Sequence, residues 1–284
     1  MLSVVIPANN EEAYVEACLA SVFSQTVTTA AAGGLHAVLS ANACCDRTVA
    51  VAESMREGAE AAGWRLTILD RAEPGKPGAL NAADEAAGPM APGDVRVYLD
   101  ADVVAEPALF AELLLALATD APRYASGRLK VAPAKSFVTR AYADFWRRLP
   151  FMTHGVPGAG LFAVNAAGRA RWDEFPSIIS DDTYVRLSFA PHEREAVDAG
   201  YLWPMVEGFS NIRRVRARQN EGVEEVYRHF PDLEANNDRV SVGPGLLLRL
   251  ALAAPIGFAV YSAMSLAVKR DMARRKAGAW TRGR

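Results

Sequence analysis

The chain has 284 residues, which is enough to bury a large core and too many for a small module stapled by disulfides. Half of its residues are hydrophobic, and 31 basic side chains nearly balance 33 acidic ones, for a net charge of −2. This composition is typical of a folded globular protein, and it excludes a disordered chain and one that coats nucleic acid.

Three cysteines form neither a disulfide framework nor a metal-binding pattern. Cys44 and Cys45 are adjacent and Cys18 stands alone, so a reducing compartment fits best. The N-terminus lacks a basic segment, and its apolar run is too short for a secretory signal. We therefore expect the folded domain to be cytoplasmic.

The first hundred residues alternate between strand-like and helix-like patterns. A β-branched run at residues 3–6 is stopped by Pro7, and a helical pattern follows over residues 14–23. The alternation continues with strands at 37–39, 65–69 and 95–99 and helices at 48–62 and 79–87. Short loops between such elements predict an α/β fold, with a mostly parallel sheet and helices on both faces.

Beyond residue 106 the alternation is less regular. The patterns predict helices over 107–119, 136–148, 183–189 and 223–230, with strands at 124–131 and 161–164. We interpret residues 106–230 as the second half of the same domain.

Two aspartates follow the predicted strand at 95–99 directly. Asp100 and Asp102 would leave the carboxyl edge of a parallel sheet on the same side, which is where ligands bind in open α/β sheets. Such a pair can hold a hard divalent cation and, through it, a diphosphate. The alternative is a solvated turn that caps the next helix.

Five motifs occur in an order that resembles family 2 glycosyltransferases of the GT-A fold. They are SVVIPANNEEAYVEACLASVFSQT, ANACCDRT, GKPGALNAA, YLDADV and ISDDTYVR. The resemblance covers about residues 1–220. It implies one Rossmann-like domain over residues 1–230, with a nucleotide-binding half at 1–105 and an acceptor-binding, catalytic half at 106–230.

The resemblance also implies a set of donor-binding residues for a nucleotide-diphosphate sugar. Asp102 would bind Mg or Mn directly, and Asp100 would share that site or face the donor ribose or sugar. Lys76 would approach the diphosphate. The loop that lines the base and ribose would contribute Pro7, Ala8, Asn10 and Glu11, and Asn42 would close over the base.

The second acidic motif of the family corresponds here to Asp181 and Asp182. Transfer with inversion needs a base that takes the proton of the acceptor hydroxyl, and by its place in the motif Asp182 suits that role better than Asp181. A neighbouring carboxylate would raise its proton affinity. The alternative is that the pair merely caps the helix predicted after it, and both roles can coexist in one residue pair.

A basic segment at residues 213–218 carries four arginines. Guanidinium groups match phosphate oxygens, so a flexible loop that closes over the donor is one interpretation, and a solvated strand or membrane-surface patch is the other. We favour Arg216 and Arg218, which share a face if the segment is extended.

Two departures from the family pattern bear on the reaction. Many members have an aspartate where Ala41 stands, so the donor base stays open. The Gln-x-x-Arg-Trp signature of processive members is replaced by the stretch at 213–219, which favours transfer of a single sugar.

The C-terminal segment, residues 243–284, predicts a hydrophobic helix with a basic tail. Residues 250–268 carry no charge and could just cross a bilayer, but a crossing would separate the basic tail from a cytoplasmic domain. A break at Pro255 and Gly257 would let the segment dip into the inner face of the cell membrane or lie on it. The alternative is a helix buried against the domain or a second subunit.

The sequence thus predicts a bacterial, metal-dependent glycosyltransferase at the membrane, acting on a lipid-linked or polysaccharide acceptor and on no nucleic acid. A different class of protein, a non-catalytic nucleotide-binding scaffold for polysaccharide assembly, is the alternative. A nucleotidyltransferase is a weaker one, because it would need a Gly-rich, Arg-containing loop after the first strand.

Overall fold

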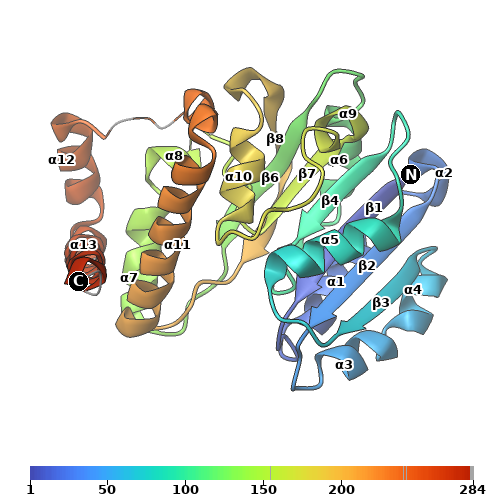
Figure 1. Ribbon diagram of the computed structural model, residues 1–284, viewed down its shortest axis with the longest axis horizontal. Helices are drawn as coiled ribbons and strands as arrows, with labels where there is room; N and C mark the ends of the chain where they lie inside the picture. The colour runs from blue at the N-terminus through green and yellow to red at the C-terminus, as the bar shows by residue number, and fades with distance from the viewer. Residues whose placement is uncertain (154, 239, 241, 282–284) are drawn as a thin grey trace.

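The structure is a computed structural model that describes residues 1–153, 155–238, 240 and 242–281, with side chains of the final helix described through Arg274. Its strands are β1 (Leu2–Ala8), β2 (Leu35–Asn42), β3 (Arg65–Arg71), β4 (Val95–Leu99), β5 (Val104–Ala105), β6 (Tyr124–Val131), β7 (Leu161–Asn165) and β8 (Arg194–Trp203). These described residues form one eight-stranded sheet in the order β3-β2-β1-β4-β7-β6-β8-β5 (Figure 1).

The first half of the sheet is parallel, as the sequence predicts. Strand β1 pairs in parallel with β2 and β4, and β2 pairs in parallel with β3. Its helices are α1 (Val15–Phe23), α2 (Thr29–Ala32), α3 (Thr48–Ser54), α4 (Arg56–Ala61) and α5 (Lys76–Ala87). The helix expected over residues 48–62 is therefore divided at Met55 into α3 and α4.

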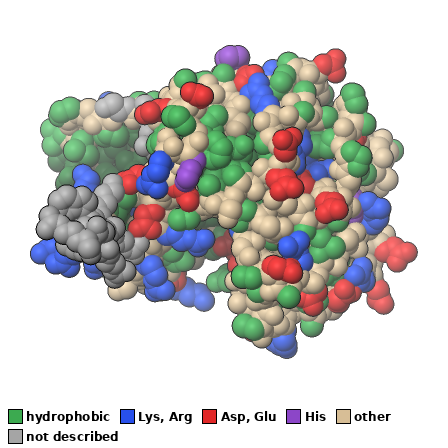
Figure 2. All heavy atoms as spheres, viewed as in Figure 1, with side chains coloured by type: hydrophobic (Ala, Val, Ile, Leu, Met, Phe, Trp, Pro, Cys, Tyr) green, Lys and Arg blue, Asp and Glu red, His purple; other side chains and the backbone are tan. Residues whose placement is uncertain are grey.

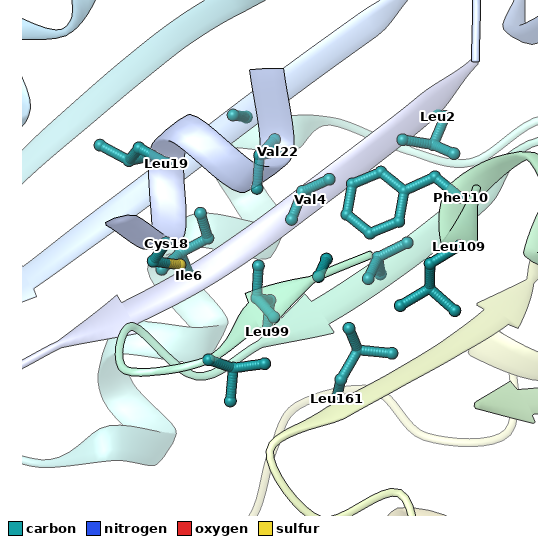
Figure 3. Close-up of a cluster of buried hydrophobic side chains, with 14 of the residues drawn as sticks. Leu2, Val4, Ile6, Cys18, Leu19, Val22, Leu99, Leu109, Phe110 and Leu161 are labelled. Carbon is teal, nitrogen blue, oxygen red and sulfur yellow. The ribbon is translucent and has the colours of Figure 1, made fainter. Parts of the chain in front are cut away.

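Successive residues of β1 face opposite sides of the sheet, and each side has its own core. Leu2, Val4 and Ile6 pack with Leu19 of α1 and with Phe110 (Figure 3). Val5 instead belongs to the cluster on the α5 side, together with Val38, Leu80 and Ala83. Because both faces are covered, β1 is buried along its whole length.

The second half of the sheet is mixed. Strand β7 is antiparallel to β4 and β6, β8 is parallel to β6, and the short β5 is antiparallel to β8. The helical elements here are α6 (Leu109–Ala116), α7 (Phe137–Trp146), α8 (Pro150–Thr153), α9 (Ala166–Arg169), α10 (Asp181–Leu187), η1 (Pro191–Glu193), α11 (Phe209–His229) and η2 (Pro231–Asn236). The sequence patterns missed β5 and β8.

The expectation of an extended arginine segment is wrong. Residues 213–218 lie within α11, a helix of 21 residues. Buried positions at helical spacing explain this, since Ile212, Gly222 and Val226 share one side of the helix among the charged residues.

The C-terminal segment forms two helices, α12 (Pro244–Ala253) and α13 (Pro255–Thr281), which break where Pro255 was expected to interrupt them. Helix α13 lies beside α7 and α11 (Figure 1). The approach is close, because a Cβ added to Gly257 would lie 2.7 Å from the carbonyl oxygen of Ala141. Within the described part of the chain, no helix has both the length and the apolar character to cross a membrane.

A buried ionic network fixes α5 to the sheet. The Asp84 carboxylate accepts hydrogen bonds from Arg96 Nη1 at 2.5 Å and Tyr98 Oη at 2.9 Å, and it pairs with Arg169 at 3.0 Å. Asp84 is 7% exposed and Arg96 2% exposed. The network sets the position of α5, whose first residue is Lys76.

Replacing Asp84 by alanine should destabilise the protein by about 3–5 kcal/mol, because two arginines would keep buried charge without its partner. The free energy of unfolding in urea measures this. Asp198→Ala, which removes the partner of the exposed Arg128, is the control and should change little. Equal effects of the two substitutions would contradict the assigned role of the network.

Candidate active site

A pocket of about 610 Å³ opens at the carboxyl ends of β1, β2 and β4. Ligands of open α/β sheets bind at this edge. Predicted site residues from distant parts of the chain line it together: Pro7, Ala8, Glu11, Asn42, Lys76, Asp100, Asp102, Asp181, Asp182, Arg216 and Arg218. The two acidic motifs, 80 positions apart in the sequence, therefore meet in one pocket.

Lys76 joins the two acidic motifs. Its Nζ lies 2.8 Å from Asp100 Oδ1 and 3.1 Å from Asp181 Oδ2. Gly75, with φ at +117°, turns the chain immediately before Lys76, a backbone conformation that favours glycine. Asp181 is the first residue of α10, so the lysine ties the starts of two helices to the end of β4.

The carboxylates at the Asp102 end of the pocket repel one another. Burial and the charges of Asp100 and Glu11 raise the pKa of Asp102 to about 7. Burial and the charge of Asp100 likewise raise the pKa of Glu11. Excess negative charge of this kind is relieved by a bound cation.

The oxygen-rich donors suit Mg or Mn, yet they do not make a complete cage. Among the described residues, no three His, Cys, Asp or Glu side chains form a metal-binding cluster. Mg²⁺ commonly takes one or two carboxylates and completes its coordination with substrate phosphates. The residues present therefore fit a cation that arrives with a phosphate-bearing ligand.

Asp181 and Asp182 differ in their surroundings. Asp181 is 4% exposed, and burial raises its pKa although the Lys76 charge opposes the shift. Asp182 is less buried, and its Oδ1 accepts a hydrogen bond from the Thr183 amide at 2.7 Å. Of these two carboxylates, Lys76 lies within ion-pair distance of Asp181 and not of Asp182.

Asn42 organises the loops at the other side of the carboxylates. With its amide oriented to satisfy both neighbours, it donates to the Ala8 carbonyl and accepts from the Gly75 N–H at 3.1 Å. Asn9 lines the pocket and donates to the Asn42 carbonyl. Asn10 lies outside the lining, and its side chain accepts a hydrogen bond from the Cys45 amide at 2.8 Å.

The C-terminal helix contributes to the site, which sequence reasoning missed. The Arg216 guanidinium lies 5.0 Å from the ring centre of Tyr261 and 5.8 Å from that of Tyr142, and it donates to Ser265 Oγ at 3.2 Å. Tyr261 and Ser265 belong to α13, so that helix and α7 together hold the arginine. No sequence signal linked these positions, because the contact depends on how α13 packs.

The comparisons with known proteins agree with this geometry. The family model described as Glycosyl transferase family 2 matches residues 3–170, which is more than half of the chain. A comparison with curated proteins finds no match.

Several solved structures share the fold at low identity. A mannosyltransferase from Pyrobaculum calidifontis, in complex with GDP-Man and Mn²⁺, matches with a TM-score of 0.56 at 19% identity, over 98% of this chain and 80% of its own. Glucosyl-3-phosphoglycerate synthase from Mycobacterium tuberculosis, in complex with Mn²⁺, UDP and phosphoglyceric acid, matches with a TM-score of 0.52 at 19% identity. The match covers 80% of this chain and 78% of that one.

TarS from S. aureus matches with a TM-score of 0.52 at 14% identity over 80% of this chain. This chain spans only 43% of the length of that protein. At these identities the structural matches show the fold, whereas the family model covers strands β1 to β7, from residue 3 onward, and the first acidic motif. The chain therefore belongs to glycosyl transferase family 2, and it is an enzyme that transfers a sugar from a nucleotide-sugar donor.

Proposed function

We propose that the enzyme transfers one sugar, with inversion and with the help of Mg or Mn, to a hydroxyl of a lipid-linked or polysaccharide acceptor. The observation that carries this proposal is the meeting of Asp100 and Asp102 with Asp181 and Asp182 in one pocket. The Mn²⁺ and nucleotide complexes of the similarly folded enzymes support a cation and a nucleoside diphosphate as ligands.

The donor would occupy the sheet edge. Asp102, with Asp100 beside it, would hold the cation, which when bound neutralises charge that develops on the departing diphosphate. Asn42 and the loop at residues 7–11 would receive the base and ribose. Lys76 pairs with Asp100 and Asp181, and on donor binding it would exchange one of these two partners for a diphosphate oxygen.

The acceptor proton would go to Asp182. The acceptor oxygen forms a bond to the anomeric carbon while the bond to the diphosphate breaks on the opposite face, and the hydroxyl proton passes to the carboxylate. Asp182 suits this role because Lys76 neutralises its neighbour Asp181 instead. Asp181 would then position Lys76 and the start of α10.

Asp182→Asn should lower kcat by about 100- to 10,000-fold, because an amide cannot accept the proton. Binding of the nucleotide sugar should be retained. The measurements are sugar transfer and donor hydrolysis in a screen of nucleotide sugars with Mn²⁺ or Mg²⁺, and donor binding by calorimetry.

Asp102→Ala is the matched control, and it should weaken metal-dependent donor binding itself. Full turnover by Asp182→Asn would contradict the assignment of the base and favour a non-catalytic role. Donor binding that ignores both the metal and Asp102→Ala would contradict the cation site.

Arg216 and Arg218 would contact the diphosphate from α11. Tyr261→Leu removes one aromatic face from beneath Arg216, so it should weaken donor binding by about 3- to 30-fold, the range expected of a cation–π contact. Tyr261→Phe keeps the ring and should bind the donor like the unmodified enzyme. Equal losses in both variants, measured by calorimetry at fixed ionic strength, would show that the ring face is not what matters.

We also propose that the enzyme sits at the inner face of the cell membrane through α12. Leu248 and Leu252 are 62% and 74% exposed, and Leu246, Leu247 and Ile256 are exposed beside them. Figure 2 shows hydrophobic side chains gathered at the upper left, where Figure 1 draws α12. Such a helix favours the boundary between headgroups and acyl chains, and Lys269 and Arg270 on α13 would favour anionic lipid.

Leu248→Gln combined with Leu252→Gln should reduce cosedimentation with vesicles of phosphatidylglycerol and phosphatidylcholine several-fold, because less apolar surface enters the lipid. Leu115→Gln is the control, since Leu115 is 79% exposed on α6. Vesicle binding that is unchanged by the double substitution would contradict docking through α12.

A further inference from the structure

The pocket has a second end with a different chemical character. Beside the carboxylates, part of its lining comes from α7, α11, the end of β8 and the segment that follows it. The apolar side chains there are Tyr142, Trp146, Trp203, Pro204, Met205, Val206, Ile212 and Val215.

Aromatic rings form one wall of this apolar end. Trp146 and Trp203 stack with ring centres 5.7 Å apart and planes inclined by 22°. Phe151 packs edge-on against Trp146, with ring centres 5.2 Å apart. These contacts hold Trp146 and Trp203 in place before any ligand binds.

The apolar end directly adjoins the reacting groups. The Asp100 amide donates to the Gly160 carbonyl at 2.8 Å, and a Cβ added to Gly160 would lie only 2.7 Å from Trp203 Cδ1. Trp203 therefore packs on the backbone that positions Asp100. A molecule resting on Trp203 would have one end among the carboxylates.

The lining of this end offers little to a saccharide. An oligosaccharide would need hydrogen-bonding partners for its many hydroxyls, and desolvated hydroxyls without partners weaken binding. The polar residues that α11 contributes to the lining are Arg216, Arg218 and Gln219, and Arg216 already contacts Ser265. At the rim, Val206 and Ile179 are 42% and 38% exposed, so apolar surface is left uncovered.

We propose that this end of the pocket binds a hydrocarbon chain of the acceptor, and that the acceptor is an amphiphile whose reacting hydroxyl lies close to that chain. This inference rests on the proposed function and narrows its acceptor from two classes to the lipid one. The chain lies along Trp146 and Trp203 and leaves the pocket past Val206, while the hydroxyl faces Asp182.

The test uses simple primary alcohols as probes, because each is a hydroxyl on a chain of known length. Binding of 1-butanol, 1-hexanol and 1-octanol to the full-length enzyme is followed by tryptophan fluorescence, with Trp146→Phe and Trp203→Phe identifying the responding indoles. Affinity should rise with length, by up to about fourfold per methylene and at least tenfold from butanol to octanol. Methyl β-D-glucopyranoside and maltotriose should neither bind with comparable affinity nor displace octanol.

Two variants separate the pocket from the exposed leucines of α12. Val206→Gln should lower octanol affinity at least threefold, whereas the matched control Leu248→Gln should leave it unchanged. No dependence on chain length, tighter binding of the saccharides, or equal losses in both variants would each overturn the inference.

A parallel titration with the nucleotide sugar and Mn²⁺ distinguishes failure of this inference from failure of the proposed function. Intact donor binding combined with no preference for longer alcohols defeats the hydrocarbon subsite alone. Absent donor binding defeats the proposed function, whatever the alcohols do.

Discussion

The ion pairs of Lys76 with Asp100 and Asp181 are the contact on which the site depends. Four aspartates in one crevice would repel one another, and a single ammonium group at the start of α5 offsets part of that repulsion from both motifs at once. Its position is set from two directions, by the turn at Gly75 and by the buried network that fixes α5 to β4 through Asp84. The same arrangement leaves a net negative centre that a divalent cation would complete.

The two ends of the pocket differ in chemical character, since one is lined by charged groups and the other by apolar side chains. The end at the parallel strands is built from carboxylates, amides and one lysine, groups that suit a cation and a diphosphate. The end at α7 and α11 is built from indole rings and aliphatic side chains. Arg216 lies between these environments, with its guanidinium against two tyrosine rings and a serine. Polar and apolar ligand groups would thereby meet near Asp182.

The sequence predicted the parallel half of the fold well, because β1, β2 and β4 are short, mostly apolar segments, buried along their whole length, that end in recognisable turns. It also placed both acidic motifs in one crevice. It missed β8, whose acidic residues and Gly200 weaken any strand pattern, so that pairing with β6 and β5 is what makes it a strand. It mistook part of α11 for an extended segment, since charged side chains there mask the buried positions. It selected Asn10 as a donor-binding residue, whereas the structure places Asn9 in the pocket lining. The sequence does not show the positive φ that the loop backbone has at Asn10.

The contacts of Arg216 with Tyr261 and Ser265 have a consequence for the order in which the enzyme folds. Strands β1 to β7, the aspartates and Lys76 all precede residue 183, whereas Tyr261 and Ser265 are synthesised some eighty positions later. A ribosome-bound chain could thus assemble the acidic crevice well before Arg216 makes its contacts with α13. Full donor affinity would be reached only when α13 docks, so the order of translation would separate formation of the acidic crevice from completion of the donor site.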